Sequence, residues 1–293
     1  METIEMAFSF NLIADLLEIL QYQFMQHAIE AGTVVAIVAG IVGYFVVLRR
    51  SSFAAHALSH IGFAGAAGAV LFAVSPVYGL LLFTGVGGSA MAVLSPRAAN
   101  RDVHIGTVLA FMLGLGVLFI SLYAGNLTQT YSILFGQILG ISGSDVLLTL
   151  AAGIVILATV GVVYRPLLFS SLDQDVAEAK GMPTFLLGIV FMLLVAVATS
   201  IAVQVVGVLL IFSLMVTPAA IAQQLAKRPQ TALIVSVAIA LVATWLGLFV
   251  AYYEPYPVSF FITTIVFSLY LLVRFAYRRI RPLRVFRATS EIT

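Results

Sequence analysis

The amino-acid sequence predicts an all-α polytopic membrane protein with about nine transmembrane helices. Of its 293 residues, 62% are hydrophobic and only 9% are charged, whereas about a quarter of the residues in a soluble domain are charged. This composition excludes a soluble globular protein and a disordered one. The apolar residues also occur in long runs, and the basic residues fall only between certain runs. These three observations predict the fold class and the topology.

Nine apolar runs have the length of a membrane span, which needs about 20 apolar residues. Ser75 and Pro76 separate two runs that otherwise nearly fuse, and a second pair is interrupted only by Ser200 and Gln204. If the second pair crosses the membrane only once, the alternative is eight spans with one re-entrant segment. The nine runs cover residues 28–48, 52–74, 77–95, 105–124, 146–164, 184–202, 204–224, 231–252 and 257–277.

The basic residues predict the orientation of these spans. With nine spans, all 14 lysines and arginines fall on the same side of the membrane. Cytoplasmic loops carry the excess of Lys and Arg. We therefore expect the N-terminus outside the cell and the C-terminus in the cytoplasm.

The two ends of the chain are expected to lie outside the membrane core. Residues 1–27 form a periplasmic interfacial segment, in which residues 8–27 have the apolar spacing of an amphipathic helix on the outer surface. Residues 28–278 form a single transmembrane domain. Residues 279–293 form a basic cytoplasmic tail, expected to be frayed and to meet anionic headgroups.

The sequence carries no motif for ATP hydrolysis. A Walker A loop ends in Gly-Lys-Ser/Thr, but the two lysines, Lys180 and Lys227, are followed by Gly181 and Arg228. If transport is driven by ATP, the ATPase is another chain. The acidic residues lie in loops or at span ends, which disfavours a proton-coupled carrier, because such carriers keep carboxylates in their spans.

A pair of histidines, His56 and His60, is the strongest candidate for chemistry. The two residues are four apart on the second span, so they share one helix face. At 1.5 Å per residue from Arg50, His56 lies about 9 Å and His60 about 15 Å into a core of about 30 Å. Two imidazoles at this spacing could share a divalent cation. The alternative is that both histidines are structural and donate hydrogen bonds to carbonyls of a neighbouring helix.

The same helix continues with small residues, among them Gly62 and Gly65. This face is either a wall of a translocation path or a surface for close helix packing. In the seventh span, Pro218 is expected to kink the helix, because proline lacks the N–H that an α-helix uses.

The longest polar loop after the fifth span predicts a short helix outside the membrane. Asp173 is a suitable N-cap, and Lys180 and Gly181 followed by Pro183 end the helix. Gly181 is expected to adopt a positive φ. The helix is either a docking element for a cytoplasmic partner or a solvated connector. On the outer side, the Tyr252–Pro257 loop carries Glu254, which could receive a cationic ligand or a partner; the alternative is a simple interfacial turn.

Four stretches of the chain carry a resemblance to a known family. They are VLRRSSFAAHALSHIGFAG (Val47–Gly65), LFGQILGIS (Leu134–Ser142), SLDQDVAEAKGMP (Ser171–Pro183) and VGVLLIFSLMVTPAAIA (Val206–Ala222). Together they resemble the membrane permeases of bacterial ABC importers for zinc, manganese and iron. With matching hydropathy, the resemblance covers residues from about 22 to 275.

This resemblance implies the metal-importer permease fold in the bacterial inner membrane. It also implies a homodimer bound to two ATP-binding subunits, served by a periplasmic or lipoprotein metal-binding protein, with no nucleic acid involved. The chain would be a transport subunit rather than an enzyme, with a divalent transition metal as its substrate and no covalently bound cofactor. The loop helix resembles the family's coupling helix, whose residues here would be Asp173, Asp175, Ala177, Glu178 and Gly181.

The histidine pair matches the family in part. His60 corresponds to the family's membrane-embedded histidine, whereas at the position of His56 many members carry an acid, usually Asp. Imidazole suits zinc and iron, while carboxylates suit manganese. His56 therefore favours zinc slightly. Two other classes remain open from the sequence: a secondary carrier for a small solute and a non-transporting membrane interaction protein.

Overall fold

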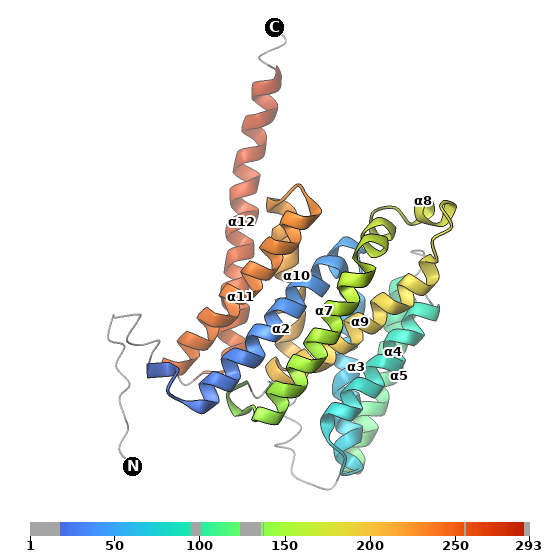
Figure 1. Ribbon diagram of the computed structural model, residues 1–293, viewed down its shortest axis with the longest axis vertical. Helices are drawn as coiled ribbons and strands as arrows, with labels where there is room; N and C mark the ends of the chain where they lie inside the picture. Colours follow the sequence, from blue (N-terminus) through green and yellow to red (C-terminus); the bar gives the residue numbers. More distant parts are fainter. Residues whose placement is uncertain (1–17, 95–100, 124–135, 137, 255, 290–293) are drawn as a thin grey trace.

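The computed structural model describes residues 18–94, 101–123, 136, 138–254 and 256–289, and within them every regular element is a helix (Figure 1). The all-α prediction is confirmed. The α-helices are α2 (Gln23–Leu48), α3 (Ser52–Leu71), α4 (Pro76–Leu94), α5 (Arg101–Leu122), α7 (Gly143–Leu172), α8 (Gln174–Ala179), α9 (Thr184–Val206), α10 (Val208–Leu225), α11 (Pro229–Tyr253) and α12 (Val258–Thr289); the 3-10 helix η1 covers Ile138–Gly140.

Each of the nine predicted spans corresponds to one helix. Among the described residues, eight of these helices are long and apolar enough to cross a membrane, and α10 is a shorter apolar helix. The choice between nine spans and eight with a re-entrant segment therefore depends on whether α10 crosses the membrane. The sequence left the same question open for this segment.

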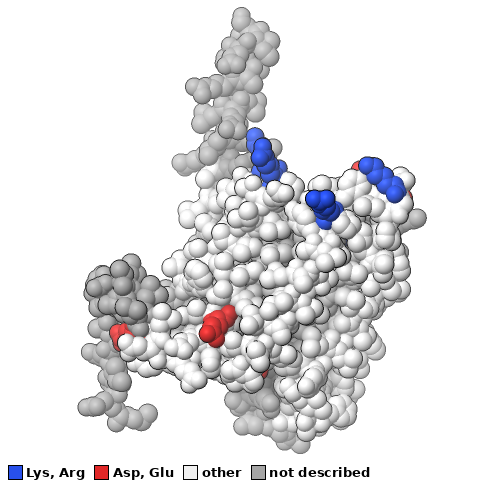
Figure 2. Space-filling model, viewed as in Figure 1, with Lys and Arg blue, Asp and Glu red and all other residues white. Residues whose placement is uncertain are grey.

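The arrangement of charge agrees with the predicted clustering of basic residues. On the face shown in Figure 2, the lysines and arginines lie only at the upper end, where Figure 1 places α8 and the connection between α10 and α11. Acidic side chains also occur lower down on this face. We call the end with α8 the α8 end; that it faces the cytoplasm stays a prediction.

The break between α9 and α10 lies at Gly207, a few residues later than predicted. Gly207 has φ +85°, a backbone conformation that glycine adopts at low cost. The polar residue taken for the break, Gln204, instead stays inside α9. Its Nε2 donates to Oδ1 of Asp145 on α7 at 2.9 Å, whereas its Oε1 is buried without a hydrogen-bond partner.

The two ends of the chain also differ from the prediction. α2 begins at Gln23, so residues 23–27 belong to the first long helix rather than to a separate interfacial segment. A hydrogen bond between Nδ1 of His27 and the Ile141 carbonyl oxygen, at 3.2 Å, stabilises this first turn. The remainder of the predicted amphipathic helix, residues 8–17, lies outside the described residues. The predicted frayed tail is helical as far as Thr289 as part of α12, in keeping with the good helix propensity of arginine.

Small residues let the helices approach closely. α3 packs on α4 where Gly65 faces Gly79, and a Cβ added at either position would overlap the other residue's carbonyl oxygen. α2 packs on α10 where Gly43 faces the carbonyl of Met215. Close packing of this kind gives helices in lipid their van der Waals attraction. α2 contacts α7, α9, α10 and α11, while α3 joins this group to α4 and α5.

Candidate functional site

The two predicted histidines lie together on α3. The ring centroids of His56 and His60 are 4.7 Å apart and the rings meet edge to face at 78°. Both side chains are half-buried. His56 also meets the ring of Phe212 on α10, at 5.0 Å and 72°. The pair therefore lies where α3 faces α10.

One ring nitrogen of His56 has no hydrogen-bond partner in the fold. Its Nδ1 is buried and has no hydrogen-bond partner. A buried polar atom without a partner is uncommon and costs about 1–3 kcal/mol. This finding weakens the alternative in which His56 donates a hydrogen bond to a neighbouring helix, because the fold supplies no partner for this nitrogen.

The pair alone does not make a complete metal site. Within the described residues, no group of three or more His, Cys, Asp or Glu side chains could hold a metal ion. Tetrahedral zinc sites use four ligands. Any metal held by His56 and His60 would take its further ligands from water, from neutral donors or from a second chain.

The small-residue face beyond the histidines is a packing surface. A Cβ added at Gly62 would lie 3.1 Å from Cδ2 of Leu80 and 3.2 Å from Cγ2 of Thr84, and one at Gly65 would overlap the backbone of Gly79. All three neighbours are on α4. Both glycines therefore face a neighbouring helix, which favours the packing interpretation over the path wall.

The loop helix has the local structure that the sequence predicts. α8 begins after Asp173, whose Oδ1 accepts a hydrogen bond from the Val176 N–H at 3.0 Å, and Gly181 ends the turn with φ +76°. Ala177 is fully buried, while Asp175 and Glu178 are exposed. α8 thus presents charged side chains at one end of the molecule (Figure 1).

The two remaining predicted site residues, Glu254 and Pro218, lie in different parts of the fold. Glu254 is an exposed residue at the end of α11. Pro218 lies inside α10, which continues through it from Val208 to Leu225; the kink stays a prediction. The carbonyl of Met215, one turn before Pro218, packs against Gly43 of α2.

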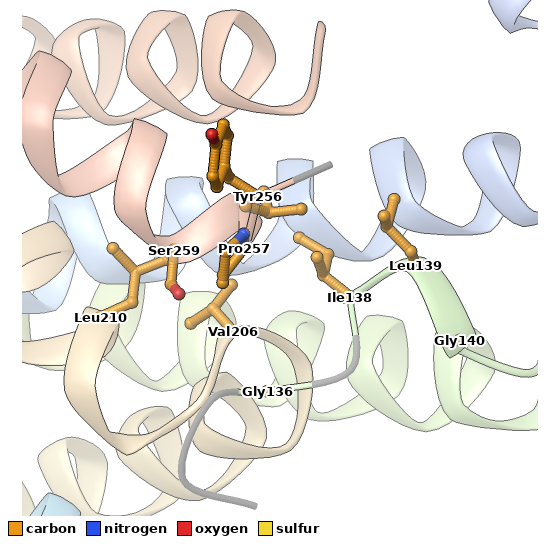
Figure 3. Close-up of a pocket in the computed structure, with 10 residues that line it drawn as sticks. Gly136, Ile138, Leu139, Gly140, Val206, Leu210, Tyr256, Pro257 and Ser259 are labelled. Atoms are coloured by element: carbon orange, nitrogen blue, oxygen red, sulfur yellow. The ribbon is translucent and has the colours of Figure 1, made fainter. Parts of the chain in front are cut away.

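An apolar cavity of about 360 Å³ lies at the end of the molecule away from α8 (Figure 3). The predicted outer loop contributes Tyr256 and Pro257, which stand over the junction of α9 and α10 in this view. The sequence did not predict this cavity, because its walls come from three segments that are far apart along the chain. The lining residues are Gly136, Ile138, Leu139, Gly140, Val206, Leu210, Tyr256, Pro257, Val258 and Ser259.

Sequence reasoning also missed the contact between His56 and Phe212. Phe212 lies in one of the four stretches that carry the resemblance, but nothing in its spacing pairs it with α3. Only the packing of α10 beside α3 brings the two rings together.

Comparison with known proteins gives consistent matches along most of the chain. The model of the ABC 3 transport family matches residues 21–277. The manganese transport system membrane protein MntC of Listeria monocytogenes is 31% identical over 239 residues, which are 80% of this chain and 84% of that protein. The manganese import system permease protein ScaB of Streptococcus gordonii is 31% identical over 232 residues, 79% of this chain and 83% of that protein.

A solved structure has the same architecture. PsaBC from Streptococcus pneumoniae, determined in complex with a Fab, superposes with a TM-score of 0.79 at 30% sequence identity. The match covers 89% of this chain and 95% of that chain.

Proposed function

The chain belongs to the ABC 3 transport family, and from this premise we propose that it is the membrane permease of an ATP-driven importer for divalent transition metals. The observation that carries the metal assignment is the histidine pair of α3. His56 and His60 lie 4.7 Å apart, and Nδ1 of His56 is buried without a partner. The names of the relatives, which are manganese permeases, point to the same class of substrate.

The proposed chemistry is temporary ligation. A cation that crosses the membrane loses water and needs replacement ligands, because an isolated charge in a medium of low dielectric is very costly. Two neutral imidazoles lower this cost. Both ligands are neutral, so they bind the cation less tightly than a set that includes a carboxylate would, and the cation is not trapped.

The proposed assembly supplies what one chain lacks. The chain is a transport subunit, and ATP hydrolysis is carried out by separate subunits. We propose that two copies of the chain form a homodimer in the bacterial inner membrane, on two ATP-binding subunits that dock at α8. In such a dimer, two histidines from each copy could offer up to four nitrogens. A metal-binding protein would deliver the cation on the opposite side.

Manganese is the first candidate for the transported metal. The similarity to manganese permeases supports this choice. His56 favours zinc or iron instead, because imidazole suits these metals better than it suits manganese. A preference for zinc from this residue stays a prediction.

The test is uptake by proteoliposomes that contain the permease with its partner ATPase. We expect labelled manganese to accumulate only when the ATPase and hydrolysable ATP are both present, and unlabelled zinc or iron to compete. Vesicles without the ATPase are the matched control. Uptake of equal size without the ATPase would identify a secondary carrier instead, and no uptake of any divalent metal would contradict the proposed function.

A further inference from the structure

We infer that Arg49 is a positioning residue that couples the docking helix α8 to the start of α3, the helix that carries His56 and His60. The inference rests on the proposed function, because it assigns the route by which events at the ATPase would reach the histidines. It is carried by four groups of contacts: those of Arg49 with α7, those of Arg49 with α9, those of α8 with the same two helices, and the hydrogen bonds inside the short turn between α2 and α3.

The first contacts join Arg49 to the end of α7. Its Nη1 donates to the hydroxyl oxygens of Ser170 and Ser171, at 3.3 Å each. Both hydroxyls donate their own protons to the Leu167 carbonyl. Their oxygen lone pairs are therefore left to accept from the guanidinium. Ser170 is 4% exposed, so this contact is shielded from water, where it would otherwise be weakened.

A second contact joins Arg49 to α9. The guanidinium carbon lies 4.9 Å from the centroid of the Phe191 ring. Phe191 is 1% exposed. A cation over a desolvated aromatic face is held more strongly than one in water. Arg49 thus contacts both α7 and α9, the two helices that enter and leave α8.

The helix α8 is fastened to these same two helices. The Thr184 hydroxyl, at the start of α9, donates to Oε1 of Glu178 at 2.7 Å. Nζ of Lys180 lies 5.0 Å from the centroid of the Phe169 ring on α7. Because both of its flanks are tied, a displacement of α8 by a docked partner moves the ends of α7 and α9 with it.

The turn that carries Arg49 is tight. Only Arg49, Arg50 and Ser51 separate α2 from α3. The Ser51 N–H donates to the Val46 carbonyl at 2.8 Å, and its hydroxyl donates to the Arg49 carbonyl at 3.2 Å. A turn with so many internal bonds transmits a displacement rather than absorbing it. His56 lies about 7 Å along α3 from this turn, at 1.5 Å per residue.

The decisive measurement is the amount of metal taken up per ATP hydrolysed by the reconstituted permease–ATPase complex. In Arg49→Met the side chain keeps an unbranched stem and loses its donors and charge. We expect normal assembly and ATP hydrolysis, with uptake per ATP reduced about tenfold, the size of effect typical for a lost hydrogen bond to a charged group. Arg49→Lys, which keeps the charge, should recover part of the loss.

The matched control is Arg50→Met, at the neighbouring exposed position with the same loss of charge. Its uptake per ATP should stay within about twofold of the wild type, as is usual for surface substitutions. Equal uptake per ATP in Arg49→Met and Arg50→Met would overturn the inference, as would loss of ATPase binding in Arg49→Met, which would assign Arg49 to docking alone. If Arg49→Met does not accumulate in the membrane, the double variant Ser170→Ala/Ser171→Ala replaces it, with the same expected loss and the same overturning outcome.

A second measurement does not depend on metal transport. The chain has no cysteine, so Val176→Cys on α8 and Phe53→Cys on α3, both at exposed positions, introduce the only two thiols of each permease chain for spin labels. With Arg49 present, α8 and the start of α3 should move together, so the distance between labels should not change when ATP is added. In Arg49→Met it should change. A distance that shifts with ATP in both backgrounds, or in neither, would contradict the inference even if the wild type transported no metal.

Discussion

The α8 end and the histidine pair are both polar regions of a largely apolar molecule. They differ in whether their polar side chains have partners within the fold. At α8, Asp173 accepts a backbone N–H, Glu178 accepts a threonine hydroxyl, and Lys180 lies over an aromatic ring. In the histidine pair, the rings contact each other and Phe212, and Nδ1 of His56 has no partner.

This difference suggests different roles: the α8 side chains stabilise the local structure, whereas the histidine pair is the proposed ligand site. A polar side chain whose hydrogen bonds are complete holds its neighbours in place. An unsatisfied buried nitrogen destabilises the fold instead, by about 1–3 kcal/mol. The temporary metal binding that we propose for this pair would account for such a nitrogen within a membrane helix. The contrast therefore predicts that substitutions at α3 change metal handling, whereas those at α8 change only its coupling to ATP.

The largest expected effect tests the histidine side of this contrast. We expect His60→Ala to reduce metal uptake by about 100-fold or more, since loss of even an indirect metal partner costs 10–100-fold in affinity. Binding of the ATPase should be unchanged, because α8 is untouched. The measurement is labelled manganese uptake beside co-purification, with His104→Ala at an exposed position of α5 as the control. Undiminished uptake would assign a structural role to His60.

The next effect tests the α8 side. Gly181 has φ +76° and open space where a Cβ would lie. Gly181→Arg should place a bulky charge on the docking surface and lower co-purification with the ATPase, or raise ATP hydrolysis per metal transported, by about tenfold for a loss of 1.4 kcal/mol. Gly181→Asn is the control, because asparagine tolerates this backbone conformation better than other residues with a side chain. If both variants bind and transport like the wild type, α8 is a connector rather than a docking element.

Local features made the α8 end predictable from sequence. The acidic cap at Asp173 and the terminating Gly181 lie within nine residues of each other, so their spacing alone specifies a short helix. The apolar runs predicted the nine long segments in the same way. The predicted division between α9 and α10 lies a few residues too early because the Nε2 of Gln204 has a partner inside the membrane helices, Oδ1 of Asp145, 59 residues away.

The rest of the site depends on contacts between distant segments. The serine partners of Arg49 lie 121 and 122 residues further along the chain, and no spacing rule links them. Likewise, the sequence could not show whether Gly62 and Gly65 line a path or pack, because both uses require small residues; the neighbouring atoms of α4 favour packing.

The smallest expected effect concerns His56 alone and tests its contribution to the choice of metal. His56→Asp replaces an imidazole by a carboxylate at the position where many members of the resembling family carry an acid. Carboxylate oxygen suits manganese better than imidazole nitrogen does, so we expect transport to persist with a gain for manganese over zinc of about threefold to tenfold. The measurement is uptake of labelled manganese against increasing zinc, compared with His56→Asn, which removes the imidazole without adding charge. A gain of equal size in both variants would show that losing the imidazole is enough. No change in either would place metal selection elsewhere, and the unpartnered Nδ1 of His56 would then need another explanation.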